Sequence, residues 1–112
     1  MTITTIAIGK QLGQFVDEYI GDQHCLLELL RFLGRHPLTR FSRLAIIHAL
    51  DTGRPQTERA LNYLVGNGVV RVAVENGLPV YSLTEKDSLS HQVLNLAGLN
   101  WNEWKSLLEE AQ

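Results

Sequence analysis

The sequence predicts a mainly α fold of the α+β class, in which short amphipathic helices surround one two-stranded β-hairpin. Two short helical stretches between residues 39 and 66 are separated by Asp51-Thr52-Gly53-Arg54, which requires a tight turn between them. Gly68 follows the second stretch, and two β-rich runs then flank Asn76-Gly77, a dipeptide that favours tight hairpins. Further helical patterns precede and follow this unit.

Length and composition bound the class of protein. A chain of 112 residues builds one ordinary hydrophobic core, so we expect a single domain over residues 1–112. Its expected parts are an N-terminal helix within 10–20, a central unit over 23–84 and C-terminal helices within 85–112. With 45% apolar and 20% charged residues, the chain is neither disordered nor a membrane protein. The single cysteine and a start without a basic leader indicate a cytoplasmic protein.

The N-terminal part is predicted to hold two helices. Residues 1–8 alternate Thr and Ile, which fits either a strand or a disordered arm. Apolar residues then recur at helical spacing over 10–19. Gly21-Asp22 breaks that helix, and Asp22 is placed to cap the next one. Residues 24–33 are apolar nearly all round, which is typical of a central core helix, and Gly34 supplies its stop.

The first helix of the central unit is expected to begin after Thr39, as its N-cap, and to end at Asp51-Thr52-Gly53. Four residues are expected on its inner face, with the histidine buried in the core: Phe41, Leu44, Ala45 and His48.

The second helix of the unit is expected from Pro55, a favourable first helical residue, to about Gly66. At 100° per residue, four side chains point into the core: Thr57, Leu61, Leu64 and Val65. Three others point the opposite way, with Asn62 on the flank: Gln56, Arg59 and Tyr63.

The hairpin and the C-terminal helices complete the prediction. Strands are expected over 69–74 and 80–83, with residues 75–79 as the tip. Thr84 is expected to cap a helix that Gly98 ends, and a last helix is expected from Trp101 to Ala111.

Two short patterns carry a resemblance to a known group of proteins. Leu61-x-x-Leu64-x-x-x-Gly68-x-Val70 precedes the hairpin, and Tyr81-Ser82-Leu83-Thr84 closes it. In this order the chain resembles winged helix-turn-helix regulators of the MarR, ArsR and PadR kind, without matching one of these families in particular. The resemblance implies a recognition helix over 55–66, a two-stranded β-wing after it, and a role as a transcription factor.

The distribution of charge favours the same function. The net charge is −2, but all seven arginines lie between Arg31 and Arg71, where they face only Asp51 and Glu58, giving +5 for that segment. Arginine binds phosphate and guanine through paired hydrogen bonds. The alternative is a chance cluster of solvated charges. An acidic remainder lowers non-specific binding, which suits a site-specific DNA-binding protein.

The predicted DNA-binding residues lie on the second helix of the unit, near helix N-termini and on the wing. Gln56 and Asn62 can pair with adenine, Arg59 with guanine, and Tyr63 can contact a thymine methyl or a phosphate. Asn76 at the wing tip is expected in the minor groove, and phosphate contacts are expected elsewhere. The full predicted set is Arg40, Ser42, Arg43, Arg54, Gln56, Thr57, Arg59, Asn62, Tyr63, Arg71 and Asn76.

The expected partners are double-stranded DNA and a second copy of the chain. One short helix contacts few bases, so a homodimer through the N- and C-terminal helices is expected. These helices are alternatively expected to pack on their own domain. The competing function is a winged-helix module for protein–protein interaction or assembly that does not read DNA.

Other functions have weaker support in the sequence. Cys25 and the four histidines show no metal-ligand spacing, so we expect no metal, and the leucine-rich surroundings of Cys25 argue against redox sensing. No nucleophile elbow or phosphate-binding glycine loop is present. We therefore expect neither an enzyme nor a cofactor, and the sequence names no small-molecule effector.

Overall fold

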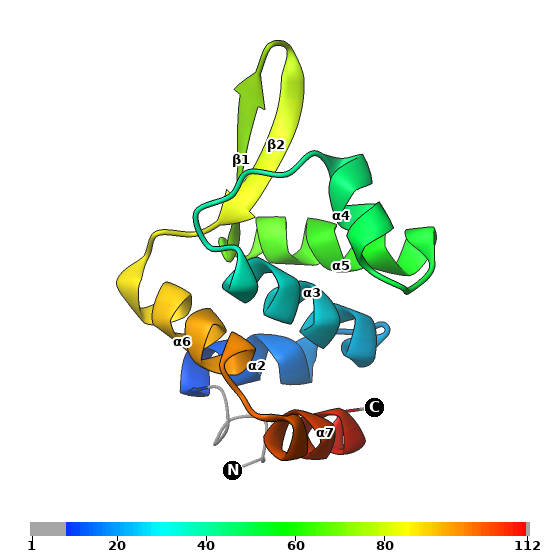
Figure 1. Ribbon diagram of the computed structural model, residues 1–112, viewed down its shortest axis with the longest axis vertical. Coiled ribbons are helices and arrows are strands. Elements are labelled where there is room, and N and C mark those ends of the chain that lie inside the picture. Colours follow the sequence, from blue (N-terminus) through cyan, green and yellow to red (C-terminus); the bar gives the residue numbers. More distant parts are fainter. Residues whose placement is uncertain (1–8, 112) are drawn as a thin grey trace.

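The computed structural model describes residues 9–111 and confirms the predicted class, a mainly helical winged-helix fold with one two-stranded antiparallel sheet (Figure 1). The expected strand or arm within residues 1–8 lies outside the described residues. Among those described, no helix is long and apolar enough to cross a membrane. The elements in chain order are α2 (Lys10–Glu18), α3 (Gln23–Arg35), α4 (Arg43–Ala49), α5 (Arg54–Gly66), β1 (Val70–Glu75), β2 (Leu78–Leu83), α6 (Asp87–Ala97) and α7 (Trp101–Glu110).

Helix α3 forms the centre of the molecule, as its apolar sequence predicts. It begins at the expected cap, because the Asp22 carboxylate accepts a hydrogen bond from the Cys25 backbone N–H at 3.1 Å. Helices α4 and α5 lie on the wing side of α3, whereas α2 and α6 lie on the other side (Figure 1). Gly34 lets α3 and α6 approach closely, since a Cβ there would lie 2.7 Å from the Val93 carbonyl oxygen.

Helix α4 differs from its prediction in start and in orientation. Its N-cap is Ser42, not Thr39, and the Ser42 hydroxyl accepts from the Ala45 N–H at 3.1 Å. The buried residues are Ile46 and Ile47, whereas Leu44 is 53% exposed. Ala45 and His48 are also exposed, so His48 is not a core histidine. The predicted inner face was wrong because Phe41, one of its four residues, lies before the helix in the extended segment that pairs with the wing.

That extended segment pairs with the wing. Phe41 and Tyr81 exchange two backbone hydrogen bonds, from the Phe41 N–H at 2.8 Å and from the Tyr81 N–H at 2.7 Å. Strands β1 and β2 pair from Val70–Leu83 to Glu75–Leu78, so both strands reach closer to the tip than predicted. Only Asn76 and Gly77 form the turn, with φ of 52° and 79°. Positive φ at both positions matches the tight hairpin turn that Asn-Gly favours, and the wing projects from the body (Figure 1).

Helix α7 forms the end of the molecule opposite the wing, whereas α6 lies beside α3 and α2 (Figure 1). Helix α6 has Lys86 as its N-cap, without a side-chain cap, so the Thr84 cap was wrong. The Thr84 hydroxyl instead accepts from the Lys86 N–H at 3.2 Å, just before the helix. Helix α7 starts with a complete capping box between Asn100 and Glu103.

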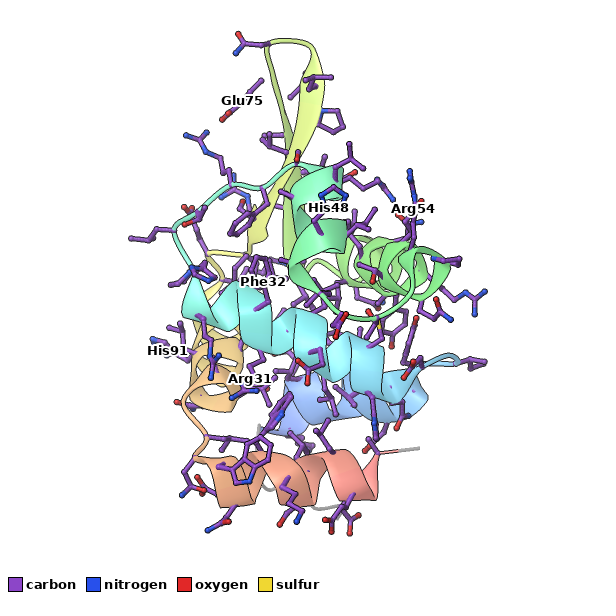
Figure 2. The ribbon with its side chains drawn as sticks, turned by 45° about the vertical axis from the view of Figure 1, so that its right-hand side comes forward. Arg31, Phe32, His48, Arg54, Glu75 and His91 are labelled. Atoms are coloured by element: carbon purple, nitrogen blue, oxygen red, sulfur yellow. The ribbon has the colours of Figure 1, made fainter. Side chains whose placement is uncertain are left out.

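Helix α7 is held on the body of the molecule by one buried tryptophan and by contacts with α3. Trp104 is 1% exposed, and the Arg31 guanidinium lies 4.6 Å from its ring centroid. Figure 2 shows Arg31 pointing from α3 towards this end of the molecule. The His24 Nε2 atom lies 2.7 Å from the Leu108 carbonyl oxygen near the end of α7. Trp101, by contrast, is 67% exposed.

Candidate nucleic-acid interface

Helix α5 presents a polar outer side beside the wing. Its buried residues lie on one face, as the spacing predicts: Thr57, Ala60, Leu61 and Leu64. The opposite side exposes Gln56, Arg59 and Asn62. Asn62, predicted on the flank, lies close to the centre of this exposed side, because the buried face includes Ala60. The inner apolar residues hold the helix while the outer ones face solvent.

Tyr63 does not belong to that exposed side. Its hydroxyl donates a hydrogen bond of 2.6 Å to the Phe15 carbonyl oxygen, and its ring centroid lies 4.6 Å from that of Tyr19. Burial raises the pKa of Tyr63, and the nearby Glu18 carboxylate raises it further, so the hydroxyl keeps its proton. Tyr63 therefore fastens α5 to α2, and the prediction that it points outward was wrong, because α2 covers this flank.

Thr57 is fully buried and cannot meet a ligand at the surface. Its hydroxyl donates to the Gly53 carbonyl oxygen at 3.1 Å and lies 2.9 Å from the Thr52 hydroxyl oxygen. The Cys25 Sγ atom lies 3.3 Å from that same Thr52 oxygen. The cluster braces the turn between α4 and α5 against α3, so its role is to position α5.

Arg43 connects three elements of the candidate surface. One guanidinium nitrogen donates to the Tyr81 hydroxyl at 2.8 Å and to Asn62 Oδ1 at 3.3 Å. The other lies 3.5 Å from a Glu58 carboxylate oxygen. Because Arg43 is on α4, Tyr81 on β2 and Asn62 on α5, the arginine holds wing and helices in one arrangement. Sequence reasoning missed Tyr81 and Glu58 as members of this surface.

Glu58 lies between two of the predicted phosphate contacts. Its carboxylate accepts from Arg54 Nε at 2.7 Å, one helical turn earlier, and faces Arg43 on the other side. The hydrogen bond from Arg54, followed by the charges of Arg54 and Arg43, lowers the pKa of Glu58. The i,i+4 spacing of Arg54 and Glu58 was available in the sequence as a signal. Both arginines are thus partly neutralised before any ligand arrives.

The remaining arginines near the wing are also paired. Arg40 forms an ion pair with Glu75 on β1, and Arg71 forms one with Glu85 at 2.9 Å. Figure 2 shows Glu75 on the projecting part of the wing, while Arg54 points outward from the start of α5. Asn76 is exposed at the turn, as expected. No Lys or Arg occurs from residue 72 to residue 85, so the outer wing carries no positive charge.

Arg59 differs from the other four predicted arginines. Within residues 9–111 it forms no ion pair, whereas Arg40, Arg43, Arg54 and Arg71 each do. It borders a shallow hollow that Glu18, Tyr19 and Ile20 also line. Among the five predicted arginines, Arg59 is therefore the one whose charge no carboxylate within residues 9–111 offsets through an ion pair.

The other chemistry-bearing residues do not gather into a site. Over residues 9–111, no three His, Cys, Asp or Glu side chains lie close enough together to hold a metal ion. Cys25 is fully buried. No protein-family model, curated protein or solved structure matches this chain. Function is therefore inferred from the geometry of the α4–α5–wing surface.

Proposed function

We propose that this protein binds double-stranded DNA sequence-specifically, as a small transcriptional regulator, and that α5 is its recognition helix. The supporting observation is the arrangement of α5, whose inner side is locked into the core while Gln56, Arg59 and Asn62 are exposed beside a projecting hairpin. A helix held in this way has the width and the polar surface that the major groove accepts.

The exposed residues supply the chemistry for base reading. The Arg59 guanidinium can donate to O6 and N7 of guanine, and the amides of Gln56 and Asn62 can pair with N6 and N7 of adenine. Arg54, at the first turn of α5, and Arg40, before α4, would contact phosphates, which fix orientation rather than sequence. Arg43 acts mainly by positioning Asn62 and Tyr81, because one of its guanidinium nitrogens already donates to both side chains.

Specific reading further requires two copies. One short helix contacts few base pairs, so two recognition helices would enter successive major grooves about 34 Å apart on a palindromic site. Binding at such a site would block or recruit the transcription machinery, which is how a protein of this size regulates a gene.

The test measures affinity for random duplex DNA at two salt concentrations and then for a duplex selected from the random pool. We expect affinity to fall steeply with salt, and Arg59→Ala to weaken binding to the selected site by about 1–3 kcal/mol. Lys105→Ala is the charge-matched control, because it removes one positive charge from α7 at the opposite end. If the two variants bind equally well, Arg59 does not read DNA.

A protein-interaction module is the second candidate, and one observation favours it. Four of the five predicted arginines are ion-paired. The outer wing has exposed valines and no Lys or Arg. This surface is less positive than the count of arginines suggests. Absence of salt-dependent DNA binding in the experiment above would favour this second function.

A further inference from the structure

The outer edge of β1 is unpaired along its whole length in the described part of the chain. Among the described residues, β1 pairs only with β2, so its other edge faces solvent. Val72 is 45% exposed and Val74 is 71% exposed on this strand. Proteins commonly protect such edges with charged side chains, Pro or a bulge, because open edges pair with other chains. Strand β1, Val-Arg-Val-Ala-Val-Glu, contains no Pro, and its two charged residues, Arg71 and Glu75, are both ion-paired within the single copy.

The backbone groups that point out of this edge can be identified. Tyr81 uses both its N–H and its C=O to pair with Phe41, on the side of β2 away from β1. The Val72–Tyr81 pair is therefore a non-hydrogen-bonded pair of the hairpin. Because hydrogen-bonded and non-hydrogen-bonded pairs alternate, the N–H and C=O groups of Val72 and Val74 both face outward.

The far edge of β2 is closed in the same region. Phe41 occupies it at Tyr81, and Pro79 has no N–H to donate at the next outward-facing position. An added strand consequently has one place to pair on the wing, which is the edge of β1.

The sequence of β1 is complementary to itself in one antiparallel register. With Ala73 opposite the partner's Ala73, Arg71 lies opposite the partner's Glu75, and Val72 lies opposite the partner's Val74. This register brings together the outward backbone groups of Val72 and the partner's Val74, which would form four hydrogen bonds across the two-fold axis. It also forms two valine pairs on one face and two opposite-charge pairs on the other.

We propose that two copies of this chain pair through β1, antiparallel and centred on Ala73, to form a four-stranded sheet from two wings. The ion pairs of the single copy, Arg71 with Glu85 and Arg40 with Glu75, are exposed and exchange readily for cross-strand pairs between copies. The proposal does not rest on DNA binding, and it is tested without DNA.

The terminal helices are a weaker dimer surface than their sequence suggests. Their apolar stripes are used within the single copy, since Leu12, Val93, Trp104 and Leu107 are all buried. Trp101 remains exposed on α7 and is the natural control position for that surface.

The first test is sedimentation velocity across micromolar to millimolar concentrations. We expect a dimer of the unmodified chain, and a monomer for Val74→Pro, which removes an outward N–H while leaving the bonds between β1 and β2 intact. Unchanged circular dichroism would show that Val74→Pro still folds. A monomeric unmodified chain would overturn the proposal. So would a dimer that survives Val74→Pro or that Trp101→Ala alone dissociates.

Charge reversal tests the register. Arg71→Glu places like charges opposite each other twice per dimer, and we expect the dissociation constant to rise roughly ten- to hundredfold. Adding Glu75→Arg to the same chain should restore dimerisation. If the double variant dimerises no better than Arg71→Glu alone, the register is wrong.

Oxidative cross-linking tests the two-fold axis. Ala73 faces its own counterpart at a Cα separation of about 4.5 Å, within disulfide reach, so Ala73→Cys should form a disulfide-linked dimer. In Val74→Cys the two cysteines are not directly opposite each other, because each lies opposite the partner's Val72. Their Cα atoms would be about 8 Å apart, so they should not form a disulfide. Cys25 is fully buried and serves as the internal thiol that does not react. Equal cross-linking of both variants would contradict the proposed axis.

Discussion

Replacing Glu58 with glutamine should make this protein bind DNA more tightly. The carboxylate lies 2.7 Å from Arg54 and 3.5 Å from Arg43 in the middle of the candidate surface. Its lowered pKa keeps it fully ionised at neutral pH, so Glu58→Gln removes one whole negative charge while keeping a hydrogen-bond acceptor for Arg54. In water, a unit charge about 7 Å from a phosphate changes the affinity by roughly threefold before salt screening.

With two neighbouring phosphates, the expected gain is roughly three- to tenfold in affinity at low salt. If one or two released arginines then contact phosphates, the plot of log affinity against log salt should steepen by about 0.9 to 1.8. Fluorescence anisotropy with a labelled duplex over a salt series measures both quantities. The variant should fold normally, because exposed ion pairs contribute little to stability.

Glu109→Gln on α7 is the matched control, since it removes the same charge from the opposite end of the molecule. Equal behaviour of the two variants would show that the Glu58 region does not approach phosphates. A loss of affinity in Glu58→Gln would also refute the reasoning, because it would assign the carboxylate to a direct contact such as cytosine N4.

Two further predictions concern how the surface is held. Tyr63→Phe removes the 2.6 Å hydrogen bond to the Phe15 carbonyl oxygen and should destabilise the fold by about 1 kcal/mol in a urea titration, while DNA affinity stays unchanged. A loss of DNA affinity without loss of stability would instead place Tyr63 at the DNA. Gly34→Ala should lower the free energy of unfolding by at least about 2 kcal/mol, because the new Cβ would lie 2.7 Å from the Val93 carbonyl oxygen. A Cβ added at Gly66 would meet nothing within 4 Å. Gly66→Ala should accordingly be neutral or slightly stabilising, and equal thermal midpoints for the two alanine variants would contradict the close contact of α3 and α6.

Features that depend on neighbouring residues were predictable from the sequence. The Asp22 cap and the Asn76-Gly77 turn follow from chemistry within a few residues, and the structure has both. The buried face of α5 also follows from its own spacing. These local signals were sufficient to predict the order of helices and the hairpin.

Features set by distant segments were not predictable. The pairing of Phe41 with Tyr81 keeps Phe41 out of α4, so the face predicted from Phe41 is not the buried face of that helix. Because α2 lies beside α5, Tyr63 does not point outward but binds α2 through its hydroxyl group. The ion pair of Arg40 with Glu75 joins residues that are far apart in the chain, so the net charge of the surface could not be predicted without the structure.

The placement of the two indoles decides what an optical unfolding experiment would report. Both tryptophans of the chain lie on α7, one sealed beneath Arg31 and the other open to water. Tryptophan fluorescence therefore reports the unfolding of the C-terminal end and does not report the hairpin at the opposite end of the molecule. A shared midpoint for fluorescence and far-ultraviolet dichroism would show that the whole molecule melts in one step.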